Sequence, residues 1–312
     1  MLDIRHIVKQ YSHHRALDDI SLRVPKGSIF GLLGPNGAGK TSLIRIINQI
    51  TAPDSGEIYF DGELLQPKHI ERIGYLPEER GLYKKMKIGE QMLYLAQLKG
   101  LSKTGARQRI TNWFEKLKME SWWDKKVEDL SKGMQQKVQF VATVVHEPDL
   151  IILDEPFSGF DPVNAQVIQD EILELNKKGA TIIYSTHRME SVEELCDHIA
   201  LINKARKVLD GPVREIKRSY KKQMYVIDFK KRDDISANLN EAPLFELVEE
   251  HTYADHHEAV IRVNEDNLLN DILLYLIPLV DIQQIKEVIP SMRDIFIDQV
   301  TTSSTPNFTQ HA

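Results

Sequence analysis

The sequence predicts an α/β fold with a parallel-sheet core, an antiparallel β layer beside it, and a smaller α+β domain after it. A glycine-rich loop at residues 34–41, Gly-Pro-Asn-Gly-Ala-Gly-Lys-Thr, lies between an apolar strand pattern and an apolar helix pattern. Further along, two fully apolar runs at 150–153 and 181–184 flank a helical pattern at 163–177. That order is typical of buried parallel strands joined by a crossover helix.

The composition limits the class of protein. The chain has 312 residues, which is enough for two domains, and a formal net charge of -6. This balance disfavours a dedicated nucleic-acid binder, so no direct nucleic-acid partner is expected. Cys196 is the only cysteine, which excludes an intramolecular disulfide. The longest apolar run, 272–280, is interrupted by Pro278 and is too short to cross a bilayer, so a membrane role would require a partner chain.

The elements of the first domain follow in order along the chain. Residues 2–24 alternate apolar and polar positions around a His-His turn, which predicts a small antiparallel layer. Another short strand is expected at 57–60. Helical spacing then runs from 88 to about 123. Together with a helix expected at 138–145, it predicts an inserted helical subdomain of about residues 88–145.

The domain boundary is expected near Gly211-Pro212, where a basic stretch begins. The first domain would span 1–215, the α+β accessory domain 216–302, and a disordered polar tail 303–312. The patterns of the second domain predict a strand at 225–229, a hairpin at 244–263, a helix at 267–276, a strand at 282–289 and a helix at 291–300.

The glycine-rich loop predicts a site for a nucleoside triphosphate. Its glycines let backbone N–H groups close around the β-phosphate at a helix N-terminus. Lys40 adds charge at the β- and γ-phosphates, and Thr41 supplies a hydroxyl for Mg²⁺. The alternative is a turn that matches this pattern by chance. Such a match is rare, and rarer still with a strand before it and a helix after it. The residues expected to hold the nucleotide are Gly34, Pro35, Asn36, Gly37, Ala38, Gly39, Lys40, Thr41 and Ser42.

Two adjacent carboxylates end the apolar run at 150–153. In a parallel sheet this edge is where ligands bind. Asp154 could hold Mg²⁺ through water, while Glu155 points the other way and could orient or deprotonate an attacking water. A solvated turn at the strand end is the alternative, which is disfavoured because a phosphate loop occurs in the same chain.

A third motif precedes the helix expected at 138–145. Ser131 occupies the position of an N-cap, and Gly133 leaves room for close backbone approach. By itself this pattern indicates only a well-formed helix start.

In this order and spacing, the motifs resemble the ATP-binding cassette (ABC) family of P-loop NTPases. The resemblance covers about residues 1–215. It is carried by the phosphate loop, Leu130-Ser131-Lys132-Gly133, Asp154-Glu155-Pro156, Ser158-Gly159-Phe160-Asp161 and Thr186-His187.

The resemblance implies a head-to-tail dimer of two copies around two Mg-ATP. Ser131 and Gly133 of one subunit would touch the γ-phosphate bound by the other, while Tyr11 would stack on adenine. Asp161 would join the subunits and His187 would sense the γ-phosphate. Each residue also has a purely structural alternative. Tyr11 could be an aromatic residue of the core, Asp161 could start the following helix, and His187 could be a surface histidine with its hydrogen bonds satisfied.

The chain departs from the family pattern at two motifs. Glu78 stands where the family has glutamine, so a carboxylate replaces an amide. It can still accept Mg²⁺ waters, but it adds negative charge beside the triphosphate. In the helix-start motif, Lys132 and Met134 replace glycine and glutamine. We expect the catalytic groups to be Glu155, His187, Lys40 and Glu78, and the Mg²⁺ ligands to be Thr41, Glu78 and Asp154.

A weaker resemblance concerns the branch of the family. Residues 78–82 and 290–297 resemble exporters whose cassette is a separate chain, like sodium-extrusion and drug-efflux ATPases. It implies an ATPase that is coupled to transmembrane transport through separate permease subunits, at the cytoplasmic face of the cell membrane.

Two rival functions remain open at this point. One is a soluble cassette protein acting as a nucleotide-controlled clamp on ribosomes or DNA, although the chain has neither a second cassette nor long coiled coils. The other is a non-hydrolysing regulatory binder, which the presence of both Glu155 and His187 disfavours.

The second domain carries no recognisable catalytic constellation. Three histidines, His251, His256 and His257, lie near Asp255 and Glu258, a combination that could ligate a metal. Their position on a polar hairpin favours solvated side chains instead, so the chemistry is expected in the first domain.

Overall fold

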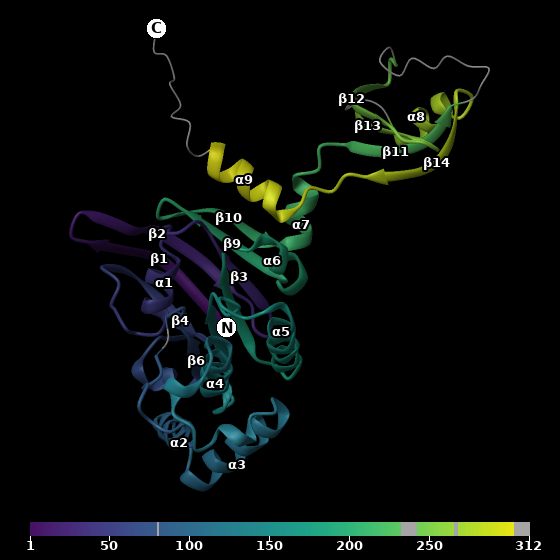
Figure 1. Ribbon diagram of the computed structural model, residues 1–312. Helices are drawn as coiled ribbons and strands as arrows, with labels where there is room; N and C mark the ends of the chain where they lie inside the picture. The colour runs from purple at the N-terminus through teal and green to yellow at the C-terminus, as the bar shows by residue number, and fades with distance from the viewer. Residues whose placement is uncertain (80, 232–241, 265–267, 303–312) are drawn as a thin grey trace. The chain divides into compact units, whose positions relative to one another are not determined.

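The computed structural model describes residues 1–79, 81–231, 242–264 and 268–302. It divides into two compact units, Met1–Val213 and Arg214–Ala312, and the boundary expected from the sequence lies after residue 215 (Figure 1). The tail expected to be disordered, 303–312, lies outside the described residues, as does residue 80. No described helix is long and apolar enough to cross a membrane.

The first unit is built on a six-stranded sheet in the order β10-β9-β3-β8-β7-β6. The neighbours along β9-β3-β8-β7-β6 all pair in parallel, whereas β10 is antiparallel to β9. Every residue of β3, β7 and β8 is buried, which explains their continuous apolar sequences and confirms the predicted core. The strands are β3 (Ile29–Leu33), β6 (Ile73–Leu76), β7 (Leu150–Asp154), β8 (Thr181–Thr186), β9 (His198–Asn203) and β10 (Arg206–Pro212).

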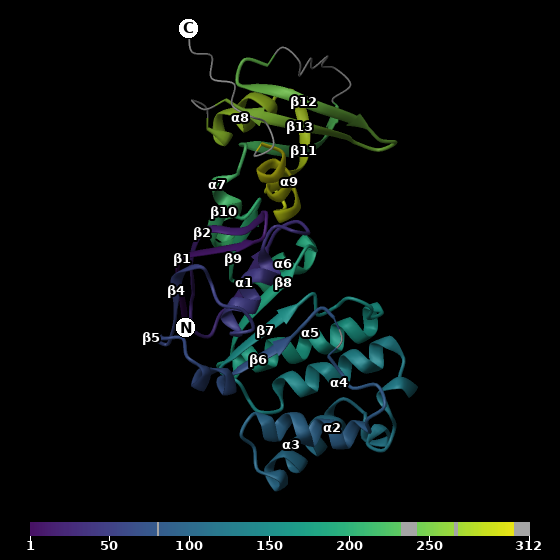
Figure 2. The ribbon, with the colours of Figure 1, turned by 90° about the vertical axis from the view of Figure 1, so that its left-hand side faces the viewer.

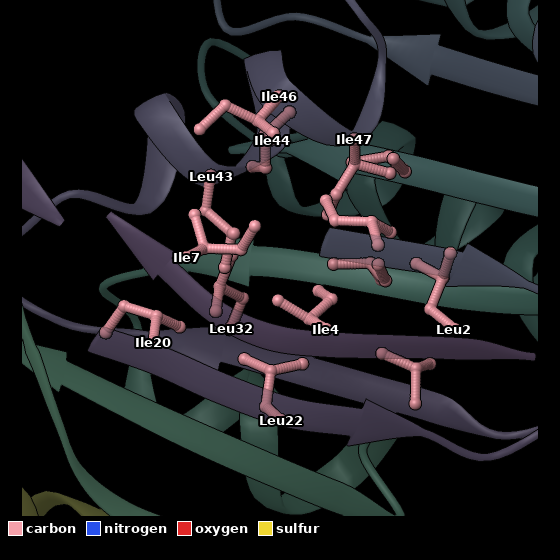
Figure 3. Close-up of a cluster of buried hydrophobic side chains, with 14 of the residues drawn as sticks. Leu2, Ile4, Ile7, Ile20, Leu22, Leu32, Leu43, Ile44, Ile46 and Ile47 are labelled. Carbon is pink, nitrogen blue, oxygen red and sulfur yellow. The ribbon is translucent and has the colours of Figure 1, made fainter. Parts of the chain in front are cut away.

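The predicted antiparallel layer lies over helix α1 (Lys40–Ile47). Its strand order is β2-β1-β4-β5. Figure 3 shows apolar side chains of β1, β2, β3 and α1 pointing toward one another, so the layer, the helix and the parallel sheet share one core. The strands are β1 (Leu2–Tyr11), β2 (His14–Val24), β4 (Ser55–Phe60) and β5 (Glu63–Leu64).

The expected helical subdomain is present and has its own core. Phe114 and Trp123 lie edge to face, with ring centroids 5.8 Å apart. A Cβ atom at Gly89 would lie 2.4 Å from Trp123, so only glycine fits beside this indole. The helices of this unit are α2 (Ile88–Leu98), α3 (Lys103–Lys116), α4 (Lys132–Val144), α5 (Pro162–Lys177) and α6 (Met189–Leu195), with 3-10 turns at Pro67–Arg72, Glu120–Trp122 and Val127–Asp129.

The second unit is an α+β domain, as predicted. Its sheet has the order β12-β13-β11-β14 with antiparallel neighbours, and Figure 2 shows α8 beside it. Ile272 and Leu276 of α8 are buried in one cluster with Ile227, Phe229 and Ile261 of the sheet. The elements are α7 (Val213–Ser219), β11 (Met224–Lys231), β12 (Phe245–Thr252), β13 (His257–Val263), α8 (Leu269–Leu276), β14 (Val280–Glu287) and α9 (Met292–Thr302).

Candidate nucleotide site

The phosphate loop is held tightly between two strands. Gly34 has φ 150°, and a Cβ atom there would lie 2.2 Å from the carbonyl oxygen of Ile202. Gly39 has φ 115°, and its Cβ would lie 2.3 Å from the carbonyl oxygen of Ala16. Both positions therefore need glycine for its backbone conformation and for the missing side chain.

The start of α1 offers an anion site at the centre of this loop. The N-cap Gly39 has no side chain to satisfy the first amides of the helix. Free N–H groups at a helix N-terminus favour a bound anion such as phosphate. Lys40 is 8% exposed, and its Nζ donates to the carbonyl oxygens of Gly34 at 2.7 Å and Pro35 at 3.2 Å. The ammonium group thus lies within the loop that would surround the phosphates.

Charges in this pocket are coupled. Burial lowers the pKa of Lys40, while Glu155, Asp154 and Glu78 favour its charged form. Burial also raises the pKa of Asp154, and Glu78 raises it further. A cation that binds here would relieve the repulsion among the carboxylates.

Thr41 and Asp154 provide the oxygen ligands that suit Mg²⁺. The Thr41 hydroxyl lies 3.5 Å from Oδ2 of Asp154, at the C-terminal end of β7. Hydroxyl and carboxylate oxygens are the donor type that Mg²⁺ prefers, usually together with water and phosphate oxygens. No cluster of three or more His, Cys, Asp or Glu side chains suited to a metal is found in the described part of the chain. The Thr41 hydroxyl and the Asp154 carboxylate fit Mg²⁺, whose remaining ligands would be water and phosphate oxygens.

Glu155 is held by the loop after β8. Its Oε1 accepts hydrogen bonds from Nδ1 of His187 at 2.6 Å and from the His187 backbone N–H at 2.9 Å. Its Oε2 accepts one from the hydroxyl of Thr186 at 3.2 Å. The backbone of Glu155 has φ 49°, which is uncommon for a residue other than glycine. Such strained backbone positions cluster at functional sites.

The side chains of this dyad differ in exposure. The Glu155 side chain is 12% exposed and that of His187 58%. The Glu155 carboxylate can only accept, so the hydrogen bond requires a proton on Nδ1 of His187. In neutral His187 the other nitrogen, Nε2, is then an acceptor. Upon protonation, Nε2 would become a donor for an anion in the pocket.

One pocket of about 360 Å³ brings most of the predicted residues together. Two further residues in its wall, His14 and Ala16, were not predicted. A signal for His14 was available, because it follows Tyr11 across a two-residue turn and the two are paired in the hairpin. The pocket is lined by Tyr11, His14, Ala16, Asn36, Gly37, Ala38, Gly39, Lys40, Thr41, Ser42, Glu78, Asp154, Glu155 and His187.

Five predicted residues do not line this pocket. Gly34 and Pro35 belong to the phosphate loop itself, where their carbonyl oxygens accept from Nζ of Lys40. Ser131 is the exposed N-cap of α4, and its Oγ accepts from the Met134 N–H at 3.3 Å. Gly133 lies in the first turn of the same helix. Asp161 caps α5 and accepts from the Asn164 N–H at 3.0 Å, so it does open the following helix.

Glu78 reaches the pocket from the segment after β6. The Gln139 side chain of α4 lies 3.4 Å from the carbonyl oxygens of both Pro77 and Glu79. The helical subdomain thus contacts the backbone on both sides of Glu78, which connects it to the nucleotide pocket.

Comparisons with known proteins show the family of the chain. Residues 17–158 match the family described as ABC transporter. An uncharacterised ABC transporter ATP-binding protein of Bacillus subtilis is 40% identical over 96% of this chain and 98% of its own length. The chain is an ABC transporter ATP-binding protein. Residues 211–300 match the C-terminal domain of ATP-binding proteins like DrrA1-3, so the second unit of this ABC protein also has relatives.

Other relatives and solved structures share the cassette. The Nod factor export ATP-binding protein I of Cupriavidus metallidurans is 35% identical over 69% of this chain and 72% of its own. A solved ATP-binding subunit of an ABC transporter superposes with TM-score 0.66 at 31% identity, covering 70% of this ABC protein and 93% of that chain. A dimeric cassette bound to ADP and Pi shares the fold, with TM-score 0.63 at 22% identity over 69% of this chain and 99% of its own.

Proposed function

We propose that this ABC protein is the ATP-hydrolysing subunit of an exporter, in which two copies close around two Mg-ATP and drive separate membrane subunits. The observation that carries the proposal is the position of Glu155. It lies in the same pocket as Lys40 and the start of α1, and it is held by His187. A positioned base next to an anion site is what hydrolysis of a γ-phosphate requires.

Each residue has a defined task in this proposal. The backbone of the phosphate loop and Lys40 bind the β- and γ-phosphates and stabilise the charge that develops there. Thr41, Asp154 and Glu78 hold Mg²⁺, which neutralises phosphate charge when bound. Glu155 accepts a proton from the attacking water, and His187 contacts the γ-phosphate from the loop after β8. Tyr11, which is 39% exposed rather than part of the core, stacks on adenine.

A second copy supplies the rest of the site. The N-terminus of α4 is exposed at Ser131 and lies outside its own chain's pocket. Among the described residues, a Cβ atom at Gly133 would meet only Phe160, at 3.7 Å, so no contact there requires glycine. A closely approaching γ-phosphate of the partner copy would require it. Asp161 would join the two copies at the interface.

Transport itself requires a membrane partner. The relative from Cupriavidus metallidurans is named for export, which supports the outward direction. Tyr83, Tyr94 and Leu98 expose apolar side chains near Glu78 and along α2. We propose that the permease subunits dock over this surface at the cytoplasmic face of the membrane, so that nucleotide binding at Glu78 and permease contact share one segment.

Affinity capture tests this function. The tagged Glu155→Gln chain would be recovered with ATP from detergent-solubilised native membranes, and its partners identified by mass spectrometry. We expect a stoichiometric multi-span membrane protein. Recovery of ribosomes or DNA would favour the soluble clamp instead, and would overturn the transporter proposal.

A further inference from the structure

His14 lies in the wall of the nucleotide pocket, at the end of the β1–β2 hairpin. We propose that His14 is a specificity-determining residue that hydrogen-bonds the ribose of the nucleotide. The inference rests on the proposed function, because it assumes that the pocket binds a nucleotide with its phosphates at the glycine-rich loop.

The hairpin presents its pocket-facing side chains in a fixed order. Tyr11 and His14 are directly paired across the two-residue turn. Ala16, two residues further along β2, lines the same pocket. The register against β1 shifts between Arg15 and Leu17, which places Ala16 at a bulge, and both His14 and Ala16 line the pocket.

Strand β2 is held against the phosphate loop, so the distance of His14 from the phosphate end of the pocket can be estimated along the strand. The Ala16 carbonyl lies directly against Gly39. The Asp18 N–H of β2 also donates to the Ala205 carbonyl at 2.8 Å, and the Ala205 N–H donates to the Ala38 carbonyl of the loop at 3.2 Å. Ala16 therefore marks the phosphate end of the pocket. His14 lies about 7 Å further out, since a strand rises about 3.3 Å per residue. Tyr11 offers the flat ring for the base, and His14, paired with it and about 7 Å from the phosphate end, would lie where the ribose joins the base to the phosphates.

The His14 side chain is available for such a contact. It is exposed and makes no hydrogen bond or ion pair with any residue in the described ranges. The neighbouring cations are engaged, Lys9 with Asp54 at 2.9 Å and Arg15 with Asp18 at 2.8 Å. An imidazole offers one donor and one acceptor, which matches a ribose hydroxyl that both donates and accepts.

Calorimetric titration of the full chain with Mg-ADP, Mg-2′-deoxy-ADP and Mg-3′-deoxy-ADP tests the inference without turnover. We expect the wild-type chain to prefer ADP to at least one deoxy analogue by about three- to tenfold, the worth of one net hydrogen bond. His14→Ala should weaken ADP binding by the same factor and bind that analogue as well as ADP. His13→Ala is the matched control, because His13 is exposed in the same turn but does not line the pocket.

The outcomes separate this inference from the function on which it rests. A His14→Ala chain that keeps the wild-type preference, or that weakens all three nucleotides equally, overturns the ribose contact while leaving nucleotide binding intact. A wild-type chain that binds none of the three, although it unfolds cooperatively, overturns the proposed function and this inference together. Thermal unfolding of His14→Ala should match the wild type, since the side chain is exposed.

Discussion

Nδ1 of His187 lies 2.6 Å from Oε1 of Glu155, so the proposed base and the proposed γ-phosphate sensor are hydrogen-bonded to each other. The backbone N–H of His187 donates to the same oxygen at 2.9 Å. The loop that carries His187 therefore holds the carboxylate through both a side chain and a backbone group. Mutation of Glu155 and of His187 therefore tests the roles proposed for this hydrogen-bonded pair.

Replacing Glu155 by glutamine should retain ATP binding but lower the hydrolysis rate by about two to four orders of magnitude, the usual contribution of a positioned base. The amide keeps the size of the side chain but cannot accept the proton. Phosphate release and nucleotide affinity would be measured on the same preparation. Glu115→Gln, on the exposed surface of α3, is the control. A Glu155→Gln chain that turns over at nearly the wild-type rate would place the base elsewhere.

Replacing His187 by alanine should slow hydrolysis on the order of a hundredfold, because one polar contact to the reacting phosphate and one restraint on Glu155 are lost together. Glu155 would keep its bonds to Thr186 and to the backbone N–H of residue 187. ADP affinity should change little, since ADP lacks the γ-phosphate. Equal losses in ADP binding and in turnover would show a general structural role instead.

The Glu78→Gln exchange should have opposite effects on metal and nucleotide. The carboxylate attracts Mg²⁺ and repels phosphates, and it lies close enough to affect the pKa of both Lys40 and Asp154. We expect the half-activating Mg²⁺ concentration to rise severalfold in this variant, while ADP measured in EDTA binds more tightly. Glu79→Gln provides the neighbouring control, because Glu79 does not line the nucleotide pocket. Changes of the same sign in both measurements would contradict the assigned position of Glu78.

The free energy of unfolding should depend on pH through His146. This side chain is 9% exposed, and burial, followed by the charge of Lys99, lowers its pKa from 6.5 to about 4 against a smaller opposing effect of the Ile73 backbone. The unfolded chain therefore binds the proton first as the pH falls. Between pH 6.5 and about 4, this group should cost at most about 1.4 kcal/mol of stability per pH unit.

Denaturant titration at several pH values checks this prediction. His146→Asn cannot take up the proton, so its stability should fall less steeply across that range than the stability of the wild type. His13→Asn, at an exposed position, should follow the wild-type slope. Parallel slopes for the wild type and His146→Asn would contradict the assignment to His146.

The fold could be predicted largely from local patterns. The fully apolar runs of β7 and β8, and the glycines at positions 34 and 39, each have one physical explanation that the structure bears out. Tertiary packing decided what the patterns could not. The sharing of one carboxylate oxygen between the His187 side chain and backbone depends on how two strand ends meet.

The site was predictable where motifs are contiguous and less so where they are not. The spacing of His14 after Tyr11 was an available signal, but its place in the pocket wall also depends on the hairpin lying against Gly39, which the sequence does not show. Ser131 lies outside its own chain's pocket, so one chain cannot test its proposed contact with a phosphate. Only a complex of two copies can do so.

The central claim is that two copies close around two Mg-ATP. Light scattering of the Glu155→Gln chain after size-exclusion chromatography, with and without Mg-ATP, tests it most directly. The account predicts a single 35.9 kDa chain without nucleotide and twice that mass with Mg-ATP. Ser131→Arg introduced into the same chain should bind ATP but stay single, because the bulky cation obstructs the interface. A Glu155→Gln chain that remains monomeric while saturated with Mg-ATP would contradict the account.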